Sequence, residues 1–107
     1  MQRFLSLSVA AVLSFALCSG APAAAVSAAD LSGKKICWDN GSASSYGSGG
    51  HYSNNVSGEG TWAMTSGGVA IHTERYDYVA AIQKLPNGSF RAEIAAAGMT
   101  LNGKYCK

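Results

Sequence analysis

The sequence predicts a small all-β domain, an antiparallel meander or barrel-like sheet of about six strands stapled by one disulfide. Three observations support this prediction. Short runs rich in β-branched and aromatic residues alternate with closely spaced turn signals, which is typical of strands joined by hairpins. Within several runs, apolar and polar residues alternate with period two, as expected where one face of a sheet is buried. Two cysteines, Cys37 and Cys106, lie near the two ends of the domain.

The start of the chain predicts a secretory signal peptide. Arg3 supplies a positive charge, residues 4–17 form an uncharged and mostly apolar run, and residues 23–29 are mostly small. The apolar run of about 14 residues is too short for a helix that spans about 30 Å of hydrocarbon. We therefore expect export to the periplasm or the cell exterior, with no transmembrane segment in the mature chain.

Two cleavage positions fit the small residues that end the leader. Cleavage after Ala25 and cleavage after Ala29 are both compatible with the pattern. The second is preferred because the composition of the chain changes at Asp30. The expected division is a signal peptide over residues 1–29 and a single small β domain over residues 30–107.

Export implies an oxidising compartment, in which two thiols of a small domain usually pair. We therefore expect a Cys37–Cys106 disulfide. A bond that closes about 70 residues would stabilise the fold by roughly 4 kcal/mol, by restricting the unfolded chain. The pairing also requires the first and last strands to approach each other, as they do in a closed or nearly closed sheet.

Six runs are expected to form strands, in chain order residues 35–38, 61–64, 69–73, 76–85, 89–94 and 100–106. Asn-Gly pairs are the clearest turn signals, because both residues tolerate the positive φ of a type I′ hairpin turn. These pairs occur at Asn40–Gly41, Asn87–Gly88 and Asn102–Gly103. Two stretches, residues 78–84 and 91–97, also fit a helix, the second because it is rich in Ala and precedes Gly98. Strand is the preferred assignment for both, and two helices there would give an α+β fold.

Residues 39–57 are polar and rich in Gly, and we expect a long loop in which Tyr46 and Tyr52 mark short strand pieces. Adaptable binding loops use this mixture of Tyr, Ser, Gly and Asn. Tyr46, His51 and Tyr52 are therefore candidate binding residues. Trp38 joins them as a stacking platform if it is exposed, and it belongs to the core if it is buried.

Charge and spacing disfavour other kinds of site. Residues 30–107 contain seven basic and six acidic side chains, a net charge of +1, with no basic stripe for nucleic acid. Cys37, His51, His72 and Cys106 lack the close pairing of metal ligands, so we expect no metal and no cofactor. A disulfide would also remove the cysteines as nucleophiles, and we expect the protein not to be an enzyme.

The general plan of the chain resembles the small periplasmic lysozyme inhibitors of proteobacteria. The points of contact are Cys37, Cys106 and the stretch 65–68, Thr-Ser-Gly-Gly, which leads into a strand. That family carries a Ser-Gly loop followed shortly by Tyr, whereas here no Tyr follows until Tyr76. The resemblance therefore implies a compact antiparallel barrel and does not carry the inhibitory motif.

The expected function is that of a small exported binding or envelope accessory protein whose partner is a glycan or an envelope or extracellular protein. Three alternatives stay open. The first is a periplasmic inhibitor of a cell-wall hydrolase such as lysozyme. The second is a small hydrolase that uses a carboxylate or His51, and the third is a structural or matrix protein.

Overall fold

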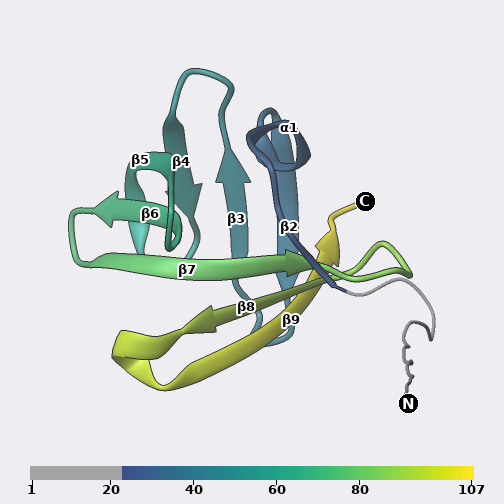
Figure 1. Ribbon diagram of the computed structural model, residues 1–107. Coiled ribbons are helices and arrows are strands. Elements are labelled where there is room, and N and C mark those ends of the chain that lie inside the picture. Colours follow the sequence, from purple (N-terminus) through teal and green to yellow (C-terminus); the bar gives the residue numbers. More distant parts are fainter. Residues whose placement is uncertain (1–22) are drawn as a thin grey trace, which may run out of the picture.

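Residues 23–107 are described by the computed structural model, and most of them belong to one antiparallel sheet that closes on itself (Figure 1). The strands are β1 (Ala24–Ala25), β2 (Lys34–Trp38), β3 (Ala43–Tyr46), β4 (His51–Asn54), β5 (Gly58–Thr65), β6 (Gly68–Thr73), β7 (Asp77–Lys84), β8 (Phe90–Ile94) and β9 (Met99–Tyr105). Strands β2 to β9 form a ring in which β2 pairs with β9 and every other strand pairs with its neighbours in the chain. The all-β prediction is confirmed, with eight barrel strands instead of about six.

Two further strands, β3 and β4, lie in the stretch expected to be a long loop with short strand pieces at Tyr46 and Tyr52. Their inward positions include Ser44 as well as Tyr46 and Tyr52, so polar residues occupy both faces and the period-two contrast is weak. A tight turn joins the two strands and uses Gly50 at a φ of +87°. The strand pieces expected at Tyr46 and Tyr52 are therefore present, but the assignment of the stretch as a long loop was wrong because this part of the barrel wall is polar on its inner side.

The other six strands are confirmed. Residues 78–84 and 91–94 are strand, and only Ala95–Ala97 form a short 3-10 turn, η2, which ends at Gly98 in the left-handed region. Helix is thus restricted to the last three residues of the second ambiguous stretch.

Two of the three Asn-Gly pairs form turns, with Gly41 and Gly88 at φ values of +88° and +86°. The third pair does not, because Asn102 and Gly103 lie inside β9 and pair with β8. A Cβ at Gly103 would stand 2.6 Å from Cε3 of Trp38. Glycine is therefore required there by close packing against the indole and not by a turn.

The N-terminal segment closes one end of the barrel. Strand β1 pairs with the end of β7, and Val26 and Leu31 are both buried. Helix α1 (Ala28–Leu31) begins with a capping box between Ser27 and Asp30. The packed fold thus includes residues before Asp30, the expected start of the mature domain; residues 1–22 of the expected signal peptide lie outside the described residues. No helix within residues 23–107 is long and apolar enough to cross a membrane.

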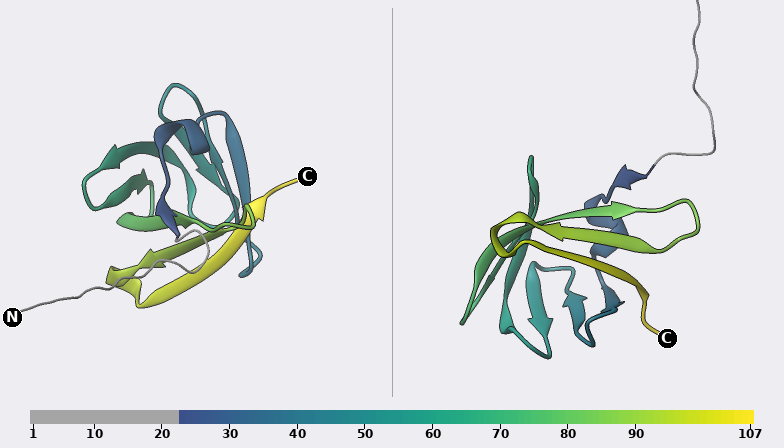
Figure 2. Two further views of the ribbon diagram at one scale, coloured as in Figure 1. Left: turned by 45° about the vertical axis from the view of Figure 1, so that its right-hand side comes forward. Right: turned by 90° about the horizontal axis from the view of Figure 1, so that it is seen from below.

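The predicted disulfide is present. Cys37 in β2 and Cys106 just after β9 are bonded, with their Cα atoms 5.2 Å apart and 69 positions apart in the chain. The bond lies beside the β2–β9 pairing, which joins the first and last strands of the ring. In both views of Figure 2, the final strand in yellow runs beside β8 toward the C-terminus.

Candidate functional site

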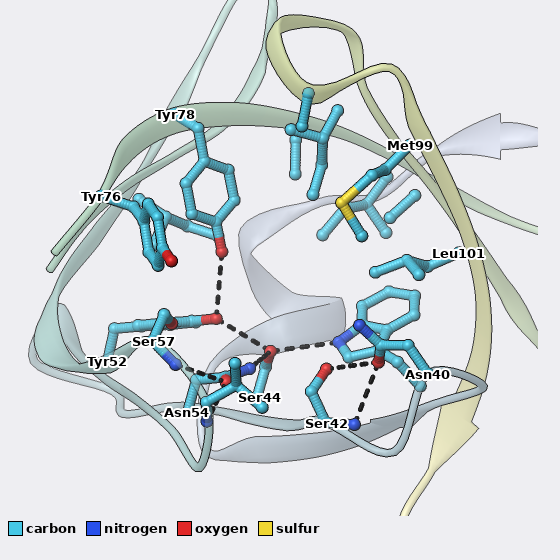
Figure 3. Close-up of a pocket in the computed structure, with 18 of the residues that line it drawn as sticks. Asn40, Ser42, Ser44, Tyr52, Asn54, Ser57, Tyr76, Tyr78, Met99 and Leu101 are labelled. Atoms are coloured by element: carbon cyan, nitrogen blue, oxygen red, sulfur yellow. Dashed lines mark hydrogen bonds between the residues drawn. The ribbon is translucent and has the colours of Figure 1, made fainter.

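The barrel interior contains a pocket of about 430 Å³ (Figure 3). It lies toward the end of the barrel where β2 finishes at Trp38, whereas α1 precedes the start of β2 at the other end. Ligand sites of small proteins commonly have volumes of a few hundred Å³ and combine apolar walls with a few placed polar groups. The pocket has this composition, with its two kinds of lining on different strands.

One wall of the pocket is apolar. Inward positions of β6 to β9 and the η2 turn supply it, and alternation along each strand places these side chains on one face. The main contributors are Ile71, Ala80, Ile82, Ala92, Ile94 and Leu101. Small alanines at two of these positions leave room for a guest next to the larger aliphatic groups.

The facing wall is polar and comes from β3, β4 and the turns on either side of them. Its members are Asn40, Ser42, Ser44, Tyr52, Asn54 and Ser57. Most of these groups are held by short-range hydrogen bonds. Asn40 Oδ1, for example, accepts from the backbone nitrogen and the hydroxyl of Ser42 at 3.0 and 2.7 Å. The polar wall is therefore pre-organised by its own turns.

Ser44 is the centre of this wall. Its Oγ accepts hydrogen bonds from Nε1 of Trp38 at 3.1 Å and from Nδ2 of Asn54 at 2.9 Å. The Asn54 amide orientation is fixed because its Oδ1 accepts from the backbone nitrogens of Val56 and Ser57 at 2.7 and 3.1 Å. An indole nitrogen only donates, so both lone pairs of the Ser44 hydroxyl are occupied.

This occupancy sets the direction of the remaining hydrogen bonds. Because Ser44 has no free lone pair, its hydroxyl donates its own proton to Oη of Tyr52, 2.9 Å away. Tyr52 in turn has one proton to donate, and Oη of Tyr78 lies 3.4 Å from it. That separation is long for an O–H···O bond, so the two phenols contact each other only weakly. The chain therefore runs from the buried indole toward the pocket and ends at Tyr78.

Aromatic packing holds this chain in place. Tyr46 packs edge-on against Tyr52 and Trp62, with ring centroids 5.4 and 5.7 Å away. Nε1 of Trp62 donates to the carbonyl of Gly47 at 2.8 Å, which ties the cluster to the β3–β4 turn. Tyr52 is therefore positioned both by its ring and by its hydroxyl.

The Tyr46 and Tyr78 phenols stay protonated in neutral solution. Burial raises the pKa of Tyr78 well above its usual range, and the neighbouring Tyr52 hydroxyl adds to the rise. Burial likewise raises the pKa of Tyr46, with a smaller contribution from Tyr52. Each buried phenol is thus a neutral group that can donate a hydrogen bond.

Ser57 has a buried hydroxyl with no hydrogen-bond partner within the described part of the chain. The residue is 6% exposed and lines the pocket. Its hydroxyl is near enough to Tyr78 to oppose the rise of the Tyr78 pKa, without reaching hydrogen-bond geometry. Such a group is uncommon, because a buried polar atom that lacks a partner costs about 1–3 kcal/mol.

Large apolar side chains surround the mouth. Val56, Tyr76 and Met99 line the pocket and are exposed by 55%, 54% and 40%. Asp77 also reaches the pocket, but its carboxylate is exposed and bonded to Nδ1 of His72 on the outside of the barrel. The entrance is thus mainly apolar.

Three of the four candidate binding residues from the sequence line the pocket. Trp38, Tyr46 and Tyr52 are buried strand residues that form part of its wall. Trp38 is therefore a core residue and does not form an exposed stacking platform. His51 points to the outside, where its Nε2 lies 4.0 Å from Oε1 of Glu59 and both side chains are more than half exposed.

The sequence analysis missed Ser44, Asn54, Ser57 and Tyr78. For Tyr78 a usable signal existed, because it shares the parity of the apolar positions Ala80 and Ile82 along one strand. For Ser44 and Asn54, the hydrogen bond between them joins strands whose pairing the sequence did not reveal, and the sequence carries no such signal for Ser57.

No protein-family model, curated protein sequence or solved structure matches this chain. Arguments about its function therefore rest on the geometry of the barrel and its pocket.

Proposed function

We propose that this chain is a small exported binding protein, not an enzyme, whose barrel interior holds a small and mainly apolar ligand. The observation that carries the proposal is the pocket of about 430 Å³, with an aliphatic wall facing a hydrogen-bonded polar wall. An apolar rim of Val56, Tyr76 and Met99 suits the entry of such a molecule. Burial of apolar ligand surface would supply about 25 cal/mol per Å² of the driving force.

The alternatives have weaker support. A hydrolase needs a nucleophile or an acid–base pair at a substrate site. The His51–Glu59 pair is exposed on the outer surface, away from the pocket. A glycan site would use an accessible aromatic face, and Trp38 is buried with its Nε1 bonded to Ser44.

Binding of a neutral fluorescent hydrocarbon amine, N-phenyl-1-naphthylamine, tests the proposal. We expect saturable enhancement of its fluorescence at one probe per chain. Ala97→Trp should abolish the enhancement, because Ala97 lines the pocket on η2 and is exposed, so a large side chain there fills the entrance without disturbing the core. Ala95→Trp is the matched control, since Ala95 belongs to the same turn and does not line the pocket.

Two results would contradict the proposal. One is the absence of saturable binding to the folded protein. The other is equal binding by the two tryptophan variants, which would place the probe elsewhere on the surface.

Export is part of the proposal, and the fold favours cleavage after Ala25. The backbone nitrogen of Val26 donates to the carbonyl of Ile82 at 3.0 Å, and the Val26 side chain is buried. Cleavage after Ala29 would remove Val26 and the start of α1 from the closed end of the barrel. The intact mass of the exported protein distinguishes a chain that begins at Val26 from one that begins at Asp30.

A further inference from the structure

Two hydroxyls of the pocket indicate what its ligand carries: that of Ser57 has no partner in the described chain, and that of Tyr78 has only a long contact with Tyr52. We propose that the occupant is a neutral molecule with an apolar body and one hydrogen-bond-accepting oxygen, such as a ketone, held by Tyr78 Oη and Ser57 Oγ. This inference rests on the proposed function, because it specifies the ligand of the same pocket.

The accepting oxygen follows from the direction of the hydrogen-bond chain. Trp38 and Asn54 occupy the lone pairs of Ser44, so its hydroxyl donates to Tyr52, and the Tyr78 hydroxyl follows at the pocket end of the chain. Within residues 23–107, the Tyr78 hydroxyl has one long contact, with Oη of Tyr52 at 3.4 Å, so its donor capacity is largely unused. A ligand oxygen at ordinary hydrogen-bond distance can accept from this hydroxyl.

Ser57 supplies an independent indication. Its hydroxyl is buried, faces the pocket beside Tyr78 and has no partner in the described chain. Figure 3 shows Ser57, Tyr52 and Tyr78 on the same side of the pocket. A carbonyl oxygen has two lone pairs and can accept from Tyr78 and Ser57 together, which removes the cost of the unpaired hydroxyl.

Neutrality follows from the charges around the pocket. Among the described lining residues there is no Lys, Arg or His, and the only carboxylate is Asp77 at the rim. Arg75, next to the rim, donates to the carbonyl oxygen of Val56 at 3.3 Å on the exposed surface. A carboxylate ligand would thus lose its hydration without gaining a counter-charge inside the pocket.

Three probes of similar size test the inference by calorimetry: 2-acetylnaphthalene, 2-ethylnaphthalene and 2-naphthoate. They share the naphthalene body and differ only in whether the substituent is a ketone, a hydrocarbon or an anion. We expect the ketone to bind roughly five- to tenfold more tightly than the hydrocarbon, the ratio that one well-made hydrogen bond produces. Naphthoate should bind most weakly.

Variants then assign the preference to particular hydroxyls. Tyr78→Phe and Ser57→Ala should each reduce the ratio of ketone to hydrocarbon affinity toward one and leave the hydrocarbon affinity unchanged or slightly higher. Tyr105→Phe is the control, because it removes a phenol hydroxyl bonded to the Asp30 carbonyl outside the pocket and should preserve the ratio. Thermal unfolding of each variant establishes that the barrel is intact.

The outcomes separate this inference from the proposed function. Equal affinity for the ketone and the hydrocarbon would overturn the inference and leave the pocket as a binding site. A ratio that survives Tyr78→Phe and Ser57→Ala, or tightest binding of naphthoate, would also overturn it. Failure of all three probes and of N-phenyl-1-naphthylamine would reject the proposed function itself.

Discussion

Removal of the Ser44 hydroxyl is the most informative change to this barrel, because a single oxygen accepts from two donors in the interior. In Ser44→Ala, Nε1 of Trp38 and Nδ2 of Asn54 both lose their acceptor. A buried donor without a partner costs about 1–3 kcal/mol. Trp38 is buried and Asn54 is only partly buried, so we expect a loss of about 2–4 kcal/mol of unfolding free energy.

Urea unfolding followed by tryptophan fluorescence measures this loss. Ser45→Ala is the matched control, because Ser45 is the next residue of β3, faces the other side and is not part of the network. It should change the free energy of unfolding by less than about 0.5 kcal/mol. If Ser44→Ala and Ser45→Ala were equally stable, the assignment of Ser44 as the shared acceptor would be refuted.

Three further perturbations have defined outcomes. Gly60→Ala should lower the free energy of unfolding in urea by about 3 kcal/mol or more, because the added Cβ would stand 1.7 Å from the backbone carbonyl oxygen of His72. Gly49→Ala is the control and should be near neutral, because the added Cβ would meet nothing within 4 Å. The backbone N–H of Ser27 donates to the Asp30 carboxylate and lowers its pKa. The stability that the ionised carboxylate contributes is therefore present above the ordinary value of 3.8 and is lost as the pH falls through the lowered pKa. Asp30→Asn should make thermal stability less dependent on pH below about 4. Alkylation should add mass at Cys37 and Cys106 only after reduction, and reduction should cost about 4 kcal/mol of stability.

Much of the fold was predictable from local pattern. Six strands are indicated by alternation and by turn residues, and the disulfide was predicted from two cysteines in a chain that we expect to be exported. The remaining two strands were expected only as short pieces at Tyr46 and Tyr52, because β3 presents Ser44 to the interior, and a buried serine cannot be told from a solvated one by hydropathy. What holds it inside is a hydrogen bond from Trp38 across the β2–β3 hairpin, and hydropathy does not reveal that bond.

The candidate site was predictable only in part for the same reason. Tyr46 and Tyr52 were selected for their chemistry and do line the pocket. His51 was selected with them because it is adjacent in sequence, but neighbours in a strand point to opposite faces. Its side chain therefore lies outside the barrel. At Gly103 the local pattern misled in another way. The Asn-Gly pair has the sequence of a turn, but the glycine lies in a strand and is needed for close contact with the Trp38 indole.

The closure of the ring has a consequence for how the molecule fluctuates. Seven of the eight strand junctions join neighbours in the chain, and only the β2–β9 junction joins distant segments. A meander of local hairpins forms quickly, whereas the distant junction must be closed against chain entropy and is the natural place for transient opening. The disulfide lies at this junction, so it limits how far β2 and β9 can separate in the native state. It keeps the interior shielded from solvent during local opening, in addition to its effect on the unfolded chain.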